Sequence, residues 1–224
     1  MESTIKNEIT LDETREDAIV RILNASGAKV GVEIGVFKGG FSKAILQGWE
    51  GKLYMIDPWR PLGDEYLDSS NHKLHATAYS DTMNSIKGLE DRAIMIRALS
   101  SQAVELFADN SLDYVYIDGN HAYDWVKEDL ELWWPKLKSG GLMAGHDYLL
   151  INWNNNPTLE NGKDMHVYAD GHQWRVSNQF YEDSDIKYAG VFGVNPAVHE
   201  FAQKHNLDYD LTNEWTSTFL ITKP

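Results

Sequence analysis

Two pairs of acidic and histidine residues lie in the middle of the chain. Asp118 and His121 follow an apolar run over 113–117, and His146 and Asp147 follow a second run over 142–144. Both runs have the composition of buried strands, and ligand sites in open α/β sheets lie outside the carboxyl ends of the strands. If the two strands are neighbours, the four side chains converge at one edge of the sheet.

Two kinds of chemistry suit these four residues. An imidazole that titrates near neutrality can take the proton from a hydroxyl, which makes His121 a candidate general base. Alternatively, Asp118, His146 and Asp147 are candidate ligands of Mg²⁺ or Mn²⁺, because these ions prefer oxygen ligands and lower the pKa of a bound hydroxyl. His146 could instead act as a second base or orient the acceptor. The residues alone leave these alternatives open.

A glycine-bearing turn indicates a binding site for an organic ligand. Glu33 lies near the end of the apolar run 29–34, and Gly35 and Gly39 complete the pattern Glu-x-Gly-x-x-x-Gly. Glycines allow a sharp turn and a close approach of a ligand to the main chain. The Glu33 carboxylate disfavours a pyrophosphate, so the pattern favours a ligand that carries hydroxyls or a positive charge.

Three further residues extend this predicted ligand site. Asp57 ends the apolar run 53–56, about 20 residues after the turn, where related sheets place a carboxylate that binds ribose hydroxyls. Leu99 and Ser100 follow another run, over 93–96. Leu99 could pack against a flat ring, and Ser100 is an equally good candidate for capping the helix that follows.

The elements that position these residues alternate along the chain. Apolar runs predict strands over 29–34, 53–56, 93–96, 113–117 and 142–144, with two more near 208–211 and 216–222. Helical spacing of apolar residues predicts helices over 11–25, 75–86, 101–107, 122–137 and 195–205, and another that contains Phe41, Ala44, Ile45 and Leu46. We expect Asp12 to cap the first helix and Gly27 to end it. This alternation predicts an α/β fold in which helices cover both faces of a parallel sheet.

The motifs, taken in this order, resemble those of the class I S-adenosylmethionine-dependent methyltransferases. The resemblance rests on the glycine turn with Glu33, the strand that ends in Asp57, and the sequences Ile117-Asp118-Gly119-Asn120-His121 and Gly145-His146-Asp147. They are similar to motifs of a branch of small bacterial and phage-type enzymes. That branch includes O-methyltransferases of sugars and natural products, some of them metal-dependent. The resemblance covers residues 29–148 well and residues 190–222 loosely.

This resemblance implies a Rossmann-like sheet of seven strands, with one antiparallel strand near the end, and S-adenosylmethionine as cofactor. It implies His121 as base and Asp118 and Asp147 as metal ligands. The cofactor-binding residues that it implies are Glu33, Gly35, Gly39, Asp57, Leu99, Ser100 and Asp118. Metal-dependent relatives usually carry two adjacent acids after the fifth strand, whereas this chain carries His146 and Asp147, so the need for a metal stays open.

One segment breaks the alternation of strands and helices. Residues 148–189 are rich in Asn, Asp, Trp and Tyr, so we expect an insertion that folds over the site as a lid or acceptor platform. The other parts are an N-terminal arm and helix (1–28), a cofactor-binding core (29–147), and a C-terminal helix with strands (190–224). A chain of 224 residues suits one sizeable α/β domain, which we expect over residues 1–224.

Composition narrows the possible partners. The net charge of −14 argues against nucleic acid or an anionic membrane surface, because phosphate binding needs Lys and Arg. The absence of cysteine excludes disulfides and thiolate chemistry. Residues 1–12 lack the apolar centre of a signal peptide, and no window reaches the ~20 apolar residues of a membrane span. We therefore expect a cytoplasmic protein with a small-molecule acceptor; a homo-oligomer is compatible with the sequence.

Other functions are weaker fits to the same residues. A nicotinamide-dependent oxidoreductase predicts a tighter glycine pattern than residues 33–40 contain. A metal-dependent hydrolase accounts for the Asp and His residues but leaves Glu33, Gly35 and Asp57 unexplained. A binding module without catalysis does not need His121 and Asp118. The sequence therefore predicts an O-methyltransferase that acts on a hydroxyl of a small acceptor, a sugar or glycosylated metabolite by preference.

Overall fold

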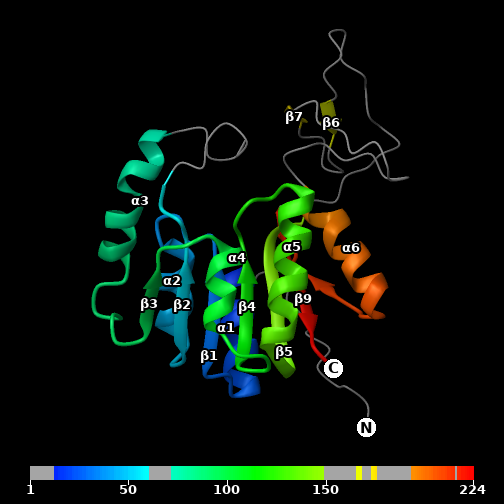
Figure 1. The fold of residues 1–224 in the computed structure, drawn as a ribbon, viewed down its shortest axis with the longest axis horizontal. Coiled ribbons are helices and arrows are strands. Elements are labelled where there is room, and N and C mark those ends of the chain that lie inside the picture. Colours follow the sequence, from blue (N-terminus) through cyan, green and yellow to red (C-terminus); the bar gives the residue numbers. More distant parts are fainter. Residues whose placement is uncertain (1–12, 61–71, 149–164, 168–172, 176–192, 215) are drawn as a thin grey trace.

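A seven-stranded sheet forms the centre of the computed structural model, which describes residues 13–60, 72–148, 165–167, 173–175, 193–214 and 216–224 (Figure 1). The strand order is β3-β2-β1-β4-β5-β9-β8. The strands are β1 (Val30–Ile34), β2 (Lys52–Ile56), β3 (Ala93–Ile96), β4 (Leu112–Ile117), β5 (Leu137–Tyr148), β8 (Asp210–Leu211) and β9 (Ser217–Thr222). β1 to β5 are mutually parallel, and β9 runs antiparallel to both β5 and β8. The predicted Rossmann-like sheet is confirmed.

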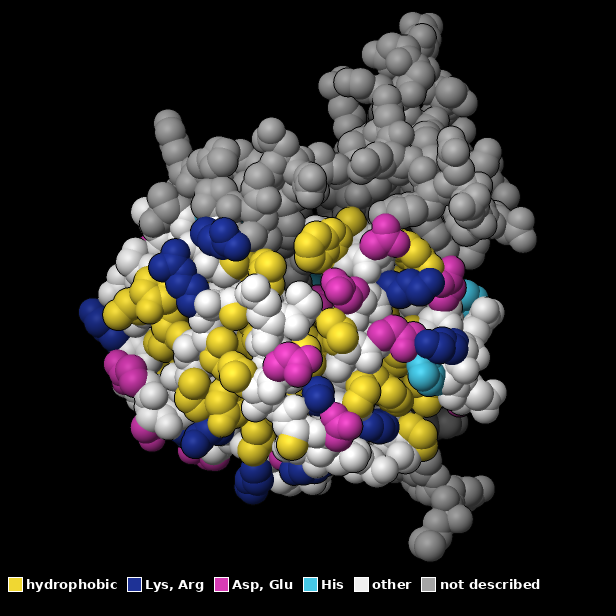
Figure 2. Space-filling view, in the orientation of Figure 1, with side chains coloured by type: hydrophobic (Ala, Val, Ile, Leu, Met, Phe, Trp, Pro, Cys, Tyr) yellow, Lys and Arg dark blue, Asp and Glu magenta, His cyan; other side chains and the backbone are white. Residues whose placement is uncertain are grey.

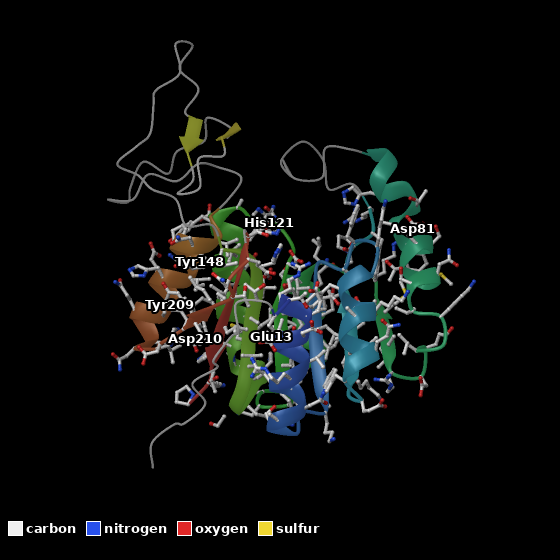
Figure 3. The ribbon with its side chains drawn as sticks, turned by 180° about the vertical axis from the view of Figure 1, so that it is seen from behind. Glu13, Asp81, His121, Tyr148, Tyr209 and Asp210 are labelled. Carbon is white, nitrogen blue, oxygen red and sulfur yellow. The ribbon has the colours of Figure 1, made fainter. Side chains whose placement is uncertain are left out.

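Helices cover both faces of this sheet (Figures 1 and 3). One face carries α1 (Arg15–Ser26), α2 (Gly40–Gly48) and α3 (His72–Ser85). The other carries α4 (Ser100–Ala103), α5 (Tyr123–Trp133) and α6 (Val194–His205), with short 3-10 turns at Val104–Leu106 and Trp134–Lys136. Acidic and basic side chains are interspersed over this second face (Figure 2). Among the described residues, no helix has both the length and the hydropathy that crossing a bilayer requires.

The core consists of two apolar layers, one on each side of the sheet. Tyr114 and Tyr116 of β4 pack into the layer beneath α1 and α2, whereas Val115 and Ile117 pack into the layer beneath α5 and α6. All four side chains are buried, because side chains alternate between the faces of a strand and both faces are covered. Burial of both faces explains why the strands appear in the sequence as short continuous apolar runs.

The structure corrects the start of the first helix. α1 begins at Arg15, and Thr14 is its N-cap, whose hydroxyl accepts a hydrogen bond from the backbone N–H of Asp17 at 3.2 Å. The predicted start near residue 11, with Asp12 as cap, is therefore wrong. Apolar spacing locates the buried face of a helix but not its first turn, which the capping side chain decides. Gly27 ends the helix at φ 70°, as predicted.

Most of the predicted insertion over 148–189 lies outside the described residues. Within it, β6 (Met165–Val167) and β7 (Gln173–Arg175) pair as antiparallel strands. On its far side the chain re-enters the described fold at Gly193, whose backbone N–H donates to the carbonyl oxygen of His121 at 2.6 Å. The boundaries of the insertion and its role as a lid stay predictions.

Candidate active site

The carboxyl ends of β4 and β5 bring together the four residues that the sequence singled out. His121 Nε2 lies 3.2 Å from Asp118 Oδ1 and 3.3 Å from Asp147 Oδ2. His146 Nδ1 lies 3.2 Å from Asp147 Oδ1 and 3.8 Å from Asp118 Oδ1. Figure 3 shows His121 and Tyr148 toward the same end of the molecule. Each of the four side chains is at most 20% exposed, so the polar cluster is largely shielded from water.

A backbone irregularity lets two consecutive residues of β5 reach the same cluster. In a regular strand, His146 and Asp147 would point to opposite faces. Here the register between β5 and β9 shifts between Gly145 and Tyr148, and Asp147 adopts a left-handed conformation with φ 56°. Such a conformation is costly for a residue with a side chain, and it is found preferentially at functional sites.

The neighbours of the cluster fix its charges and orientation. Burial disfavours the charged form of Asp118, but the hydrogen bond and charge of His121, with His146 and Arg15, outweigh burial and lower the pKa of this carboxyl. Asp118 is therefore a carboxylate at neutral pH. Thr216 Oγ1 lies 2.9 Å from His146 Nε2, which turns Nδ1 of the same ring toward the carboxylates.

Among the described residues, Asp118, His121 and Asp147 each offer one possible metal-ligand atom, and these three atoms lie within 4.8 Å of one another. The two carboxylates suit Mg²⁺ or Mn²⁺, and the imidazole favours Mn²⁺ over Mg²⁺, because nitrogen ligands suit transition metals. The histidine in this triad is His121, whereas the sequence analysis favoured His146 as the third ligand. His146 lies beside the triad, and its assignment as a ligand stays a prediction.

A second group of residues lines a pocket next to this cluster. Gly35, Asp57, Leu99 and Ser100, all predicted to bind the cofactor, lie in its wall. Further lining residues are Ile34, Ile56, Pro58, Arg60, His75, Ala98, Ser101, Gly119, Asn120, Trp125, Glu128 and Asp129. Gly119 and Asn120 come between Asp118 and His121 in the chain, so the pocket and the cluster share one loop.

The glycine turn at the end of β1 brings two strand ends into close contact. Gly35 has φ 86°, and a Cβ atom built there would lie 2.1 Å from the carbonyl oxygen of Asp118. No side chain fits between the two backbones at this point. Gly39 has φ 73° and is the N-cap of α2; it is absent from the pocket wall, and its role in binding a cofactor stays a prediction.

Asp57 links the end of β2 to the glycine turn. Its Oδ2 accepts from the backbone N–H of Phe37 at 2.8 Å, and its Oδ1 accepts from that of Trp59 at 2.6 Å. Both partners adopt left-handed conformations. Burial raises the pKa of Asp57, although the backbone N–H groups and His75 act in the opposite direction. Each carboxylate oxygen has a second lone pair with which to accept a ligand hydroxyl.

Glu33 lies beneath the turn and does not line the pocket. It is 1% exposed, and its Oε2 accepts from the hydroxyl of Ser42 on α2. Burial raises its pKa to about 8, so its neutral form is favoured below that pH. The contact between Glu33 and a cofactor stays a prediction.

Comparison with known proteins places this geometry in a family. The family model described as "Methyltransferase domain" matches residues 32–148, which contain the turn, Asp57 and the whole Asp and His cluster. The chain belongs to this methyltransferase family.

Two curated relatives have no described function. One, from Sinorhizobium fredii, is 26% identical over 108 residues, which cover 48% of this chain and 11% of that protein. The other, from Acanthamoeba polyphaga mimivirus, is 28% identical over 127 residues, which cover 55% of this chain and 53% of that protein. The chain therefore spans about half the length of one relative and much less of the other.

Solved structures share the fold over nearly the whole chain. A Staphylococcus aureus protein proposed to be a caffeoyl-CoA O-methyltransferase is 15% identical, with a TM-score of 0.61, and 96% of this chain aligns with 87% of it. A Bacillus cereus O-methyltransferase in complex with SAH is 12% identical, with a TM-score of 0.56, and 96% of this chain aligns with 84% of it. At these identities the likeness establishes the fold.

In this methyltransferase fold, one residue near the pocket differs from its predicted role. Leu99, not Ser100, is the N-cap of α4, and the Leu99 N–H donates to Gln102 Oε1 at 3.3 Å. Ser100 lies inside the helix and donates its hydroxyl to Asp129 of α5. The alternative prediction that Ser100 caps the helix is therefore wrong, because a buried acceptor on another helix binds its hydroxyl.

The contribution of α5 to the pocket was not predicted from the sequence. Trp125, Glu128 and Asp129 all line it. A signal was present in the sequence, because Asp129 falls on the buried face of the helix between Val126, Leu130 and Trp133. An acidic residue in such a row is unusual and indicates a polar partner or a ligand.

Proposed function

We propose that this protein is an S-adenosylmethionine-dependent O-methyltransferase that acts on a hydroxyl of a small acceptor. One observation carries the proposal: the pocket lined by Gly35 and Asp57 shares the loop 118–121 with a cluster that contains a histidine between two carboxylates. The first site suits a nucleoside and the second suits proton removal, and methyl transfer to oxygen requires both. The named O-methyltransferases of the same fold support this reading.

Each of the pocket residues is proposed to contact a different part of the methyl donor. Asp57 is suited to accept hydrogen bonds from the two ribose hydroxyls, since paired hydroxyls match the two oxygens of a carboxylate. Gly35 lines the pocket, and its lack of a side chain lets the end of β1 lie against the Asp118 backbone beside the ligand. Leu99 offers an apolar surface for the base. The SAH in the Bacillus cereus structure supports a ligand of this kind, because SAH is the product that remains after methyl transfer.

His121 is the proposed general base. As the acceptor oxygen attacks the sulfonium methyl group, an O–C bond forms, the C–S bond breaks, and the hydroxyl proton passes to the imidazole. Asp118 and Asp147 flank His121 Nε2 and stabilise the imidazolium that results. Positioning supplies much of the remaining acceleration, because aligned reactants avoid most of the entropic cost of the encounter.

The cluster also fits a divalent metal ion. Asp118, Asp147 and a histidine would hold Mg²⁺ or Mn²⁺, and the ion would lower the pKa of the acceptor hydroxyl and orient it. A sugar or natural-product hydroxyl is the proposed acceptor. This choice rests on the aromatic and polar composition of residues 148–189, since aromatic faces pack well on sugar rings.

Calorimetric titration with SAH tests the proposal. We expect the wild-type protein to bind SAH with micromolar affinity and Asp57→Ala to lose this binding. Asp113→Ala is the matched control. Asp113 Oδ2 also accepts two backbone N–H bonds, from Lys29 at 2.9 Å and Val30 at 3.0 Å, but Asp113 does not line the pocket. The control variant should bind SAH as the wild type does.

Two outcomes would contradict the proposal. If the folded wild type does not bind SAH, the pocket is not a site for this methyl donor. If Asp57→Ala and Asp113→Ala lose binding equally, the loss reflects general damage to the fold. Circular dichroism of each variant separates unfolding from loss of a contact.

A further inference from the structure

Asp129 is a buried acidic residue that the proposed mechanism does not use. It lies on α5 and is 7% exposed, yet it forms part of the pocket wall. Its helix neighbours on the same face, including Val126 and Leu130, are packed into the apolar layer. A carboxyl group in such surroundings loses the solvation that water would give it, unless other groups replace the lost hydrogen bonds.

Within the described part of the chain, only one of the two carboxylate oxygens of Asp129 has a hydrogen-bond donor. The Ser100 hydroxyl donates to Oδ1, and the Ser100 oxygen accepts from Trp133 Nε1 at 2.7 Å. Among the described residues, no donor contacts Oδ2. Burial raises the pKa of Asp129 to about 7, and the Ser100 hydrogen bond offsets only part of this effect. An added N–H donor from a ligand would therefore stabilise this carboxylate.

The surrounding pocket defines which ligand group reaches Asp129. Asp57, the proposed ribose partner, lies at the end of β2, whereas Asp129 belongs to α5. Leu99 and Trp125 also line the pocket, and Trp125 is 40% exposed, so its ring is available for a flat partner. Because Asp57, Leu99, Trp125 and Asp129 line one pocket, a ribose bound at Asp57 would carry its base in the same pocket as Asp129. The adenine ring of the methyl donor has one group of N–H donors, its 6-amino group.

We propose that Asp129 Oδ2 accepts a hydrogen bond from the adenine 6-amino group and thereby selects adenosine over nucleosides with a 6-oxo base. This inference rests on the proposed function and adds a specificity-determining residue to it. The 6-oxo analogue has a carbonyl oxygen in place of the 6-amino group. This oxygen and the Asp129 carboxylate are both acceptors, so no hydrogen bond can form between them. A site built to accept a hydrogen bond rejects the analogue that cannot donate one, because its own acceptor is then left unpaired.

The test compares two ligands, SAH and its 6-oxo analogue S-inosylhomocysteine, by calorimetry on the full chain at about pH 8, where Asp129, with its pKa of about 7, is mainly ionised. We expect the wild type to prefer SAH by about 10- to 100-fold, the range of a hydrogen bond to a charged group. In Asp129→Asn the preference should fall below about threefold, because an amide can present either its oxygen or its NH₂ group. Asp124→Asn is the matched control: Asp124 lies on the same helix, is exposed and does not line the pocket, so its loss should leave the preference unchanged.

Each alternative result has a separate meaning. If Asp129→Asn binds both ligands more weakly by the same factor, Asp129 only holds Ser100 and Trp133 in place, and the inference is wrong. If Asp124→Asn removes the preference as strongly as Asp129→Asn does, overall charge and not the Asp129 contact selects the base. If the wild type binds neither ligand, the proposed function itself fails. If it binds SAH and shows no preference, the proposed function stands and only this inference fails.

Discussion

At the scale of single residues, the two histidines of the Asp and His cluster have different hydrogen-bond partners. His121 contacts both carboxylates through Nε2, whereas the Nε2 atom of His146 contacts the Thr216 hydroxyl. The two histidines therefore differ in what they can do. His121 is placed to bind a proton or an ion between Asp118 and Asp147, and His146 is placed to orient whatever binds there.

We expect Mn²⁺ to bind this cluster and Asp118→Asn or Asp147→Asn to weaken binding by about tenfold or more, because each removes a charged oxygen ligand. Electron paramagnetic resonance of free Mn²⁺ measures the affinity. Asp113→Asn removes the same charge at the opposite end of β4 and should have no effect.

His121→Gln separates the two roles of this residue. If His121 is a ligand, the variant binds Mn²⁺ more weakly; if it acts only as a base, the affinity is unchanged. Equal Mn²⁺ affinity of the wild type and all the carboxylate variants would rule out a metal at this cluster.

At the scale of elements, the glycine turn is part of a junction among three strands. The Gly35 N–H donates to the carbonyl oxygen of Ile56 at 2.8 Å, and the Asp118 N–H donates to the carbonyl oxygen of Ile34 at 2.8 Å. Asp57 adds its hydrogen bonds to Phe37 and Trp59. The ends of β1, β2 and β4 are thus tied together where the proposed ligand binds.

Gly35→Ala should disrupt this junction far more than Gly27→Ala, although both glycines have positive φ angles. A Cβ atom at Gly27 meets no atom within 4 Å, so that change costs only backbone strain, about 1 kcal/mol of the free energy of unfolding. A Cβ atom at Gly35 overlaps the Asp118 backbone and should cost about 3 kcal/mol or more.

Urea denaturation measures both free energies, and SAH titration should show that only Gly35→Ala loses binding. Equal destabilisation by the two substitutions would mean that the junction relaxes without cost, contrary to the close contact in the structure.

At the scale of the whole molecule, buried carboxyl groups make the stability depend on pH. Glu33 is favoured in its neutral form up to pH about 8 in the folded protein, whereas in the unfolded chain it ionises near its ordinary pKa of 4.5. Between these values the unfolded state binds fewer protons than the folded state. Stability from this group is therefore present below pH 4.5 and declines as the pH rises toward 8.

Glu33→Gln should remove this decline. Relative to the wild type, the variant should gain about 3 kcal/mol of unfolding free energy between about pH 5.5 and pH 8, since one pKa unit corresponds to about 1.36 kcal/mol. The substituted amide can still accept the Ser42 hydrogen bond, so the packing is preserved. Urea denaturation at both pH values provides the measurement.

Glu50→Gln is the control for this pH effect, because the Glu50 side chain is 87% exposed. Its stability should follow that of the wild type at both pH values. If the free energy of unfolding has the same pH dependence in the wild type and in Glu33→Gln, Glu33 is ionised in the folded protein.

The sequence by itself located the first four strands within a residue of their ends, β3 to the residue, but predicted only 142–144 of β5, which spans Leu137–Tyr148. The parallel pairing of β4 with β5, which the sequence analysis took as a condition, brings Asp118 and His121 to the edge that holds His146 and Asp147. These features follow from local periodicity and from the resemblance in motifs, both of which a single chain displays.

Only the tertiary structure decided how the side chains within the site are paired. The left-handed Asp147 and the shifted register of β5 direct two consecutive residues to one cluster, and Ser100 binds Asp129 across two helices. Glu33 turned out to lie under the pocket and not in its wall. These outcomes depend on contacts between residues far apart in the chain, which neither spacing nor residue type specifies.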